Sequence, residues 1–187
     1  MQLQDERSVT LKNTQAKKVA LSGIFCALAI AISFLESLIP PIIPVPGIKP
    51  GFSNIVTMFS LTSLGFPYAL GITFFKAVFA LVTRGTTSFF MSLCGGLLSL
   101  FVTALLFKLS EKYVSFVGIG ISSAIAHNLG QLIVATIILG NTILNIAPFL
   151  LIGGIVCGFL TGTIFKYTVP VLNKLTKNLL KGSINKC

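Results

Sequence analysis

The charged side chains inside apolar stretches are the residues of this sequence most suited to chemistry. Lys76 lies in the middle of GITFFKAVFALVTRG, Arg84 follows two helical turns later, and Lys49 stands in an upstream proline-rich stretch. Ionisable residues inside membrane segments are costly and usually functional. Glu36 is the one acid predicted near them and can neutralise one of the three cations, which is the purely structural alternative. The surplus of positive charge predicts a site for an anionic group such as a phosphate or carboxylate.

Uncharged polar residues interrupt two further apolar segments. His127 and Gln131 are four residues apart and share a helix face, with Asn128 beside them, while Asn54 and Thr57 lie one turn apart. Amide and imidazole groups at membrane depth need partners from other helices, water or a ligand. A lone histidine is often a hydrogen-bonded packing residue, so both interpretations stay open for His127. If the site exists, these side chains are expected to bind the polar edge of its ligand.

Aromatic stacking and metal binding are less specific in this sequence. Phe52 or Phe89 can stack on a ring of the ligand, but the chain has 16 Phe residues and none is singled out. No CxxC pair or His-rich tract is present, so no metal or cofactor is expected. The cysteines in apolar segments are interpreted as small packing residues: Cys26, Cys94 and Cys157.

Composition predicts a membrane protein. The chain is 54% hydrophobic and 10% charged, whereas soluble domains carry about 25% charged residues. Six spans would place most of the 14 basic residues on one side, which by the positive-inside rule is cytoplasmic. This predicts a multi-pass protein of the bacterial inner membrane with both termini inside, and it accounts for the net charge of +10 without nucleic-acid binding. The inside set is Arg7, Lys12, Lys17, Lys18, Lys108, Lys112, Lys166, Lys174, Lys177, Lys181 and Lys186.

The predicted fold is a single all-α bundle of six transmembrane helices. A cytoplasmic tail of residues 1–18 precedes the transmembrane domain of residues 19–165, and a basic cytoplasmic tail of residues 166–187 follows. The second helix is short, because thirteen residues cover roughly 20 Å of a hydrocarbon core about 30 Å thick. If it did not cross, the later loops would change sides against the charge rule. The predicted spans are 19–39, 52–64, 68–82, 86–107, 117–139 and 143–165.

Small residues recur at four-residue spacing in three segments, which is typical of close helix contacts in membranes. Packing within the bundle is expected for Gly154, Gly158 and Gly162 and for the run Ser88, Ser92, Gly96 and Ser99. The first segment carries Gly23, Ala27 and Ala31, which could pack inside the bundle or dock a separate membrane subunit. Both interpretations stay open for this ridge.

Four motifs together resemble a known membrane family. GIKPGFSNIVTMF (47–59), FFMSLCGGLLSLF (89–101), SSAIAHNLGQLIVATIIL (122–139) and PFLLIGGIVCGFLTG (148–162) are similar to heptaprenyl diphosphate synthase component I, also described as the Gx transporter family. The resemblance covers about residues 15 to 167. Pro50 stands where that family more usually has leucine.

That family in turn resembles the S components of energy-coupling factor (ECF) transporters, which are six-helix proteins that capture a micronutrient at the outer face. The resemblance implies a transmembrane coupling subunit and ATPase subunits as partners in trans. It also implies that Ala27-x-x-x-Ala31 meets the coupling subunit and that the loop of residues 40–51 covers the site. A flavin-like or quinone-precursor-like solute would suit such a site, which is expected to take an anionic, partly aromatic ligand.

Three functions remain to be weighed. The first is capture of an anionic small molecule for transport, with energy from elsewhere, because no phosphate-binding Gly-x-x-x-x-Gly-Lys-Ser/Thr loop is present. The second is a non-catalytic accessory subunit of heptaprenyl diphosphate synthase in menaquinone side-chain synthesis. Prenyl synthases hold Mg²⁺ through clustered aspartates, and the only Asp here is Asp5, so no enzyme activity is expected from this chain alone. The third is a structural subunit of a membrane redox complex.

Overall fold

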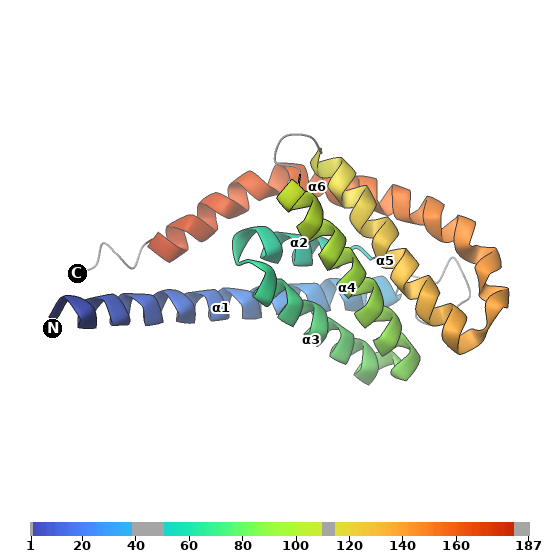
Figure 1. Ribbon diagram of the computed structural model, residues 1–187, viewed down its shortest axis with the longest axis horizontal. Coiled ribbons are helices and arrows are strands. Elements are labelled where there is room, and N and C mark those ends of the chain that lie inside the picture. The colour runs from blue at the N-terminus through green and yellow to red at the C-terminus, as the bar shows by residue number, and fades with distance from the viewer. Residues whose placement is uncertain (1, 39–50, 110–114, 182–187) are drawn as a thin grey trace.

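The protein is helical throughout the parts that the computed structural model describes, which are residues 2–38, 51–109 and 115–181 (Figure 1). This confirms the predicted all-α class. Residue-type patterns explain the breaks between helices: Gly65, Gly85 and Gly140 adopt positive φ angles at helix ends, and Pro67 starts a new helix. The helices are α1 Gln2–Leu38, α2 Asn54–Ser63, α3 Phe66–Arg84, α4 Thr86–Leu109, α5 Phe116–Leu139, the 3₁₀ helix η1 Asn141–Ile146 and α6 Ala147–Lys181.

Five segments are long and apolar enough to cross a membrane: Thr14–Leu38, Phe66–Arg84, Thr86–Leu109, Phe116–Leu139 and Asn141–Thr176. The chain is therefore a multi-pass membrane protein. The sequence predicts a sixth span at residues 52–64, and the structure forms α2 there with only 10 residues. A helix of that length covers roughly 15 Å, half the hydrocarbon core, so α2 does not span the bilayer by itself.

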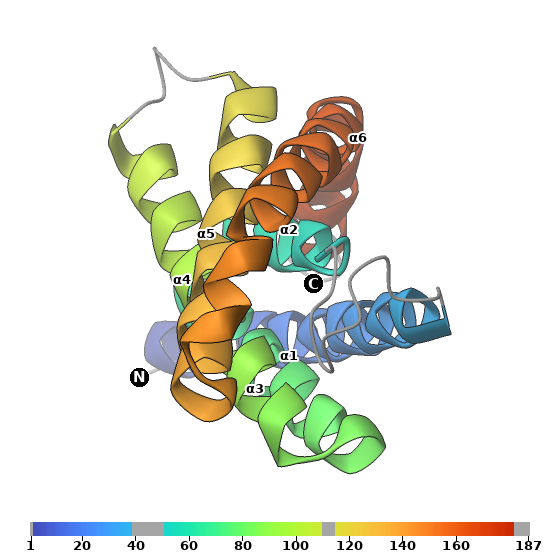
Figure 2. The ribbon, with the colours of Figure 1, turned by 90° about the vertical axis from the view of Figure 1, so that its right-hand side faces the viewer.

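Helix α2 occupies the centre of the bundle (Figures 1 and 2). It contacts all five long helices, and these contact one another in the closed order α1, α3, α4, α5, α6 and back to α1. Every residue from Asn54 to Ser60 is buried. An element surrounded in this way meets protein rather than lipid on all sides, which allows it to carry polar side chains at membrane depth.

The chain reverses direction through α2. In Figure 1, α1 runs from left to right, α2 returns toward the left and α3 runs to the right again, so both termini lie at the same end of the molecule. Helix α2 thus carries the chain back toward the start of α1 although it is too short to span the bilayer.

Glycines bring α5 and α6 into backbone contact. A Cβ added at Gly158 would lie 2.5 Å from the Cα of Ile121, and one at Gly162 would lie 2.7 Å from the Cα of Val117. A Cβ at Gly120 would lie 2.6 Å from the carbonyl oxygen of Gly158. The prediction that the glycines of the sixth segment pack within the bundle is confirmed for these positions.

The small residues of α1 lie elsewhere. Gly23, Ala27 and Ala31 are all exposed, and a Cβ added at Gly23 would meet no atom within 4 Å. Of the two interpretations, packing within this bundle is therefore excluded for the ridge as a whole. Its use as a docking surface stays a prediction.

The tails expected at the two ends of the chain are helical and continue the spans. Helix α1 begins at Gln2 rather than near residue 19, and α6 runs to Lys181 rather than ending at residue 165. Helix α6 bends along its length (Figure 1) and contains Pro170, whose ring nitrogen cannot donate the usual helix hydrogen bond. Phe165, ahead of that proline, anchors α6 in the core against the rings of Phe59, Phe107 and Phe116.

Candidate anion-binding site

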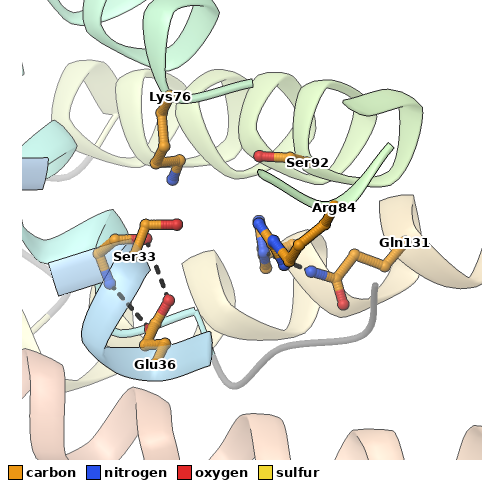
Figure 3. A pocket seen from close by; sticks show the side chains of 8 residues that line it. Ser33, Glu36, Lys76, Arg84, Ser92 and Gln131 are labelled. Atoms are coloured by element: carbon orange, nitrogen blue, oxygen red, sulfur yellow. Dashed lines mark hydrogen bonds between the residues drawn. The ribbon is translucent and has the colours of Figure 1, made fainter. Parts of the chain in front are cut away.

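A cavity opens among five helices near the ends of α1 and α3 that are remote from the termini. The empty space there is about 250 Å³ when open solvent at its mouth is counted, and the enclosed part has room for about one water molecule. The described side chains, as they stand, therefore enclose no space of the size of a whole ligand. The lining residues are Ser33, Glu36, Ser53, Lys76, Arg84, Ser92, His127 and Gln131 (Figure 3).

Lys76 is one of the two cations of this cavity. Its side chain is only 2% exposed, so it does not reach the membrane surface as a snorkelling lysine would. Its Nζ donates a hydrogen bond to Oδ1 of Asn54, 2.6 Å away. An ammonium group can donate three hydrogen bonds, and this amide oxygen accepts one of them.

Arg84 is the second cation. It is the last residue of α3, is half-buried, and points into the same space as Lys76 (Figure 3). Its guanidinium forms no hydrogen bond or ion pair with any residue of the described ranges. A guanidinium carries five N–H donors suited to carboxylate or phosphate. Arg84 therefore offers the cavity donors that no described residue uses, as well as charge.

Glu36 borders the cavity from the opposite side, on α1. Its carboxylate accepts hydrogen bonds from the backbone N–H of Ser53 at 3.1 Å and from Ser53 Oγ at 3.4 Å. The sequence suggested an ion pair between Glu36 and one of the three cations. Among the described residues no lysine or arginine nitrogen lies within 4.0 Å of this carboxylate, so neither Lys76 nor Arg84 forms that ion pair. Lys49 lies outside the described residues, and a pair with it stays a prediction.

His127 and Gln131 form the α5 side of the cavity. Their Nε2 atoms are 2.8 Å apart, so the predicted shared face brings the two side chains into hydrogen-bond contact. The imidazole is tightly enclosed, because a Cβ at Gly95 of α4 would lie 2.9 Å from its Nδ1. On another side a Cβ at Gly51 would lie 3.0 Å from its Cδ2. Gly51 also has φ +87°, a conformation that residues with a Cβ rarely adopt.

Two of the sequence motifs therefore meet at one place. Gly51 packs on His127, and Asn54, three residues later, binds Lys76. Asn54 does not line the cavity itself, but its Nδ2 is buried without a hydrogen-bonding partner among the described residues. Thr57 and Ser60 follow on α2, and their buried hydroxyl groups likewise find no partner in the described ranges. Buried polar atoms are normally paired, so this region has unused hydrogen-bonding capacity.

Other predicted binding residues lie elsewhere. Asn128 donates a hydrogen bond to the carbonyl oxygen of Leu150 at 2.7 Å, which ties α5 to α6 and keeps its side chain out of the set that lines the cavity. Phe89 stacks edge-on against Phe90, and neither it nor Phe52 lines the cavity. Lys49, and Pro50 with it, lies outside the described residues. Binding roles for Asn128, Phe52, Phe89 and Lys49 stay predictions.

Three serines of the cavity were not predicted as binding residues. Ser33 is flanked by apolar sequence, and Ser92 was assigned only to helix packing. Serine is common in membrane helices as a packing residue, so its type carries little signal. Ser53 had one signal, since it lies between Phe52 and Asn54 in the first motif.

The sequence matches the family model for heptaprenyl diphosphate synthase component I over residues 25–168. The chain belongs to the heptaprenyl diphosphate synthase component I family. All eight lining residues of the cavity fall within the matched range. Comparison with curated proteins and with solved structures found no significant match.

In the part of the chain that the structure describes, no group of three or more His, Cys, Asp or Glu side chains could hold a metal ion. The cavity combines two cations and the Glu36 carboxylate with amide, imidazole and hydroxyl groups, so the cations outnumber the anion. This chemistry is suited to binding an anion.

Proposed function

We propose that this protein is the substrate-binding subunit of a small-molecule transporter, similar to an S component of an ECF transporter. It would capture an anionic micronutrient or cofactor precursor, with any aromatic part of the ligand outside the small cavity. The observation that carries the proposal is the presence of Lys76 and Arg84 in one cavity of a membrane bundle, with Arg84 unpaired among the described residues. Two cations at membrane depth cost considerable free energy, and a role in ligand binding would explain why the protein keeps them.

The proposed orientation follows from where the cavity lies. Glu36 is two residues from the end of α1 and Arg84 is the last residue of α3, so the cavity lies toward the end away from both termini. The basic residues near the termini favour a cytoplasmic position for that end. The cavity would then open toward the outer face of the cell membrane.

The exposed ridge of Gly23, Ala27 and Ala31 supports a second part of the proposal. Small residues allow another helix to approach closely, and this ridge has no counterpart within the bundle. We assign it to contact with a transmembrane coupling subunit, which would join the protein to ATPase subunits in trans. Substitution of Ala27 by Leu would then abolish co-purification with that subunit and leave ligand binding intact.

The second candidate function is an accessory membrane subunit of heptaprenyl diphosphate synthase, which the family description favours. A cationic cavity could also hold a diphosphate, so the site does not separate the two candidates by charge alone. They differ in the partner that they require: a coupling subunit with ATPases, or a catalytic synthase component.

Native mass spectrometry of the gently purified protein tests the proposal. We expect a bound anionic small molecule, lost in Arg84→Gln and retained in the control Lys108→Gln, which removes an exposed basic residue from the last turn of α4. An adduct that persists in Arg84→Gln would contradict the proposed site. Co-purification with a synthase component, and prenyl diphosphate formation only by the two together, would favour the accessory role.

A further inference from the structure

The charges that line the cavity do not cancel. Lys76 and Arg84 carry two positive charges and Glu36 one negative charge, so with neutral His127 the described residues leave one net positive charge. Ser53, Gln131 and the other lining residues are uncharged. A net charge enclosed within a membrane protein is costly until a ligand neutralises it.

Glu36 cannot easily leave this arrangement. Its side chain is 5% exposed, and both of its carboxylate oxygens accept hydrogen bonds from Ser53, one from the backbone N–H and one from the hydroxyl. Ser53 precedes the first residue of α2, so the carboxylate also lies at the positive end of that helix dipole. These contacts fix a negative charge on the wall that faces Lys76 and Arg84 (Figure 3).

We infer that Glu36 sets the charge of the ligand, so that the cavity selects a head group with a single negative charge, such as a carboxylate, over a dianion such as a phosphate monoester. This rests on the proposed anion capture and adds the class of substrate to it. A monoanion brings the three fixed charges to neutrality. A dianion leaves a net negative charge beside Glu36 in a place of low dielectric.

Glu36 would then be a specificity-determining residue that acts by charge. The cations attract either ligand, and the negative charge of Glu36 lowers the net positive charge of the cavity by one. A neutral side chain of the same shape at this position should therefore favour the dianion. Glutamine fulfils this condition because its side-chain oxygen can still accept the Ser53 N–H.

The test compares benzoate with phenyl phosphate, which share a ring and differ in head group. At about pH 7 a phosphate monoester carries roughly 1.5 to 2 negative charges and benzoate carries one. Binding is measured as the rise in melting temperature of the purified protein in nanodiscs. We expect wild type to bind benzoate more tightly, and Glu36→Gln to shift the preference toward phenyl phosphate by roughly tenfold or more.

Ser53→Ala is the matched control. It removes one hydrogen bond to Glu36 and keeps the charge, so the preference for benzoate should remain even if both affinities fall. If wild type binds phenyl phosphate as well as benzoate or better, or Glu36→Gln leaves the preference unchanged, the inference about Glu36 is wrong while anion capture stands. If wild type binds neither probe, anion capture itself fails and the inference fails with it.

Discussion

The seam between α5 and α6 and the region where α2 meets α3 are both buried, yet the second also buries a charged side chain. At the seam, glycines bring the backbones together, and Asn128 donates from Nδ2 to the Leu150 carbonyl oxygen while its Oδ1 has no partner among the described residues. Around α2, the Nδ2 of Asn54 and the hydroxyl of Thr57 are likewise buried without a described partner, and Lys76 places an ammonium group beside Asn54. The first region gains stability from close contact, and the second retains unused binding capacity at a cost in stability. Substitutions that affect one region and spare the other can separate these two roles.

The largest expected effect is at the seam. Gly158→Leu would place a side chain where a Cβ alone lies 2.5 Å from the backbone of Ile121, so α5 and α6 would have to separate. We expect a loss of more than about 3 kcal/mol of stability or failure to fold. Thermal unfolding followed by labelling of the native cysteines measures this. Gly153→Leu on the same helix meets no atom within 4 Å and serves as the control, which should fold normally.

The next effect separates binding from stability at the cavity. Lys76→Met removes the buried ammonium and keeps most of its volume. We expect anion affinity to fall by roughly tenfold or more, with stability within about 1 kcal/mol of wild type or higher, because a desolvated charge is replaced by an apolar group. Melting curves with and without benzoate measure both quantities. Full binding by Lys76→Met would place the anion elsewhere.

A smaller effect is expected where the first motif touches His127. Gly51→Ala combines an unfavourable φ of +87° with a Cβ 3.0 Å from the imidazole, and we expect it to cost about 1–3 kcal/mol and to weaken anion binding. Gly85→Ala has φ +86° and open space around the added Cβ. It therefore carries the backbone cost alone. An equal loss of unfolding free energy in the two variants would show that the Gly51–His127 contact contributes nothing to stability.

The smallest effect tests the unpaired hydroxyl groups. Thr57→Val removes a buried hydroxyl that no described residue pairs with, whereas Thr103→Val removes one that donates to the Ser99 carbonyl oxygen at 2.7 Å. We expect Thr57→Val to be neutral or stabilising and Thr103→Val to cost about 1 kcal/mol. Chemical denaturation in detergent compares them. A clear loss of stability in Thr57→Val would show that this hydroxyl has a bound partner, such as water.

Most of the fold could be predicted from the sequence because long apolar runs are a strong signal. Positions of the breaks also followed from Gly65, Pro67 and Gly85, whose backbone preferences are local. The length and place of α2 could not be predicted in this way. Residues 52–64 resemble a short span in composition, and only contacts with all the surrounding helices make a ten-residue polar-faced helix stable there.

For the site, sequence by itself determined which residues are too costly to be buried without a reason: Lys76, Arg84, Glu36, His127 and Gln131, all of which line one cavity. Their residue types carry that information because desolvation of charged and polar groups depends little on the fold. Tertiary structure alone decided that Ser53 binds Glu36, that Gly51 packs on His127, and that Asn128 faces α6. Those facts depend on which helices are neighbours and how each is rotated, and residues far apart in sequence set both.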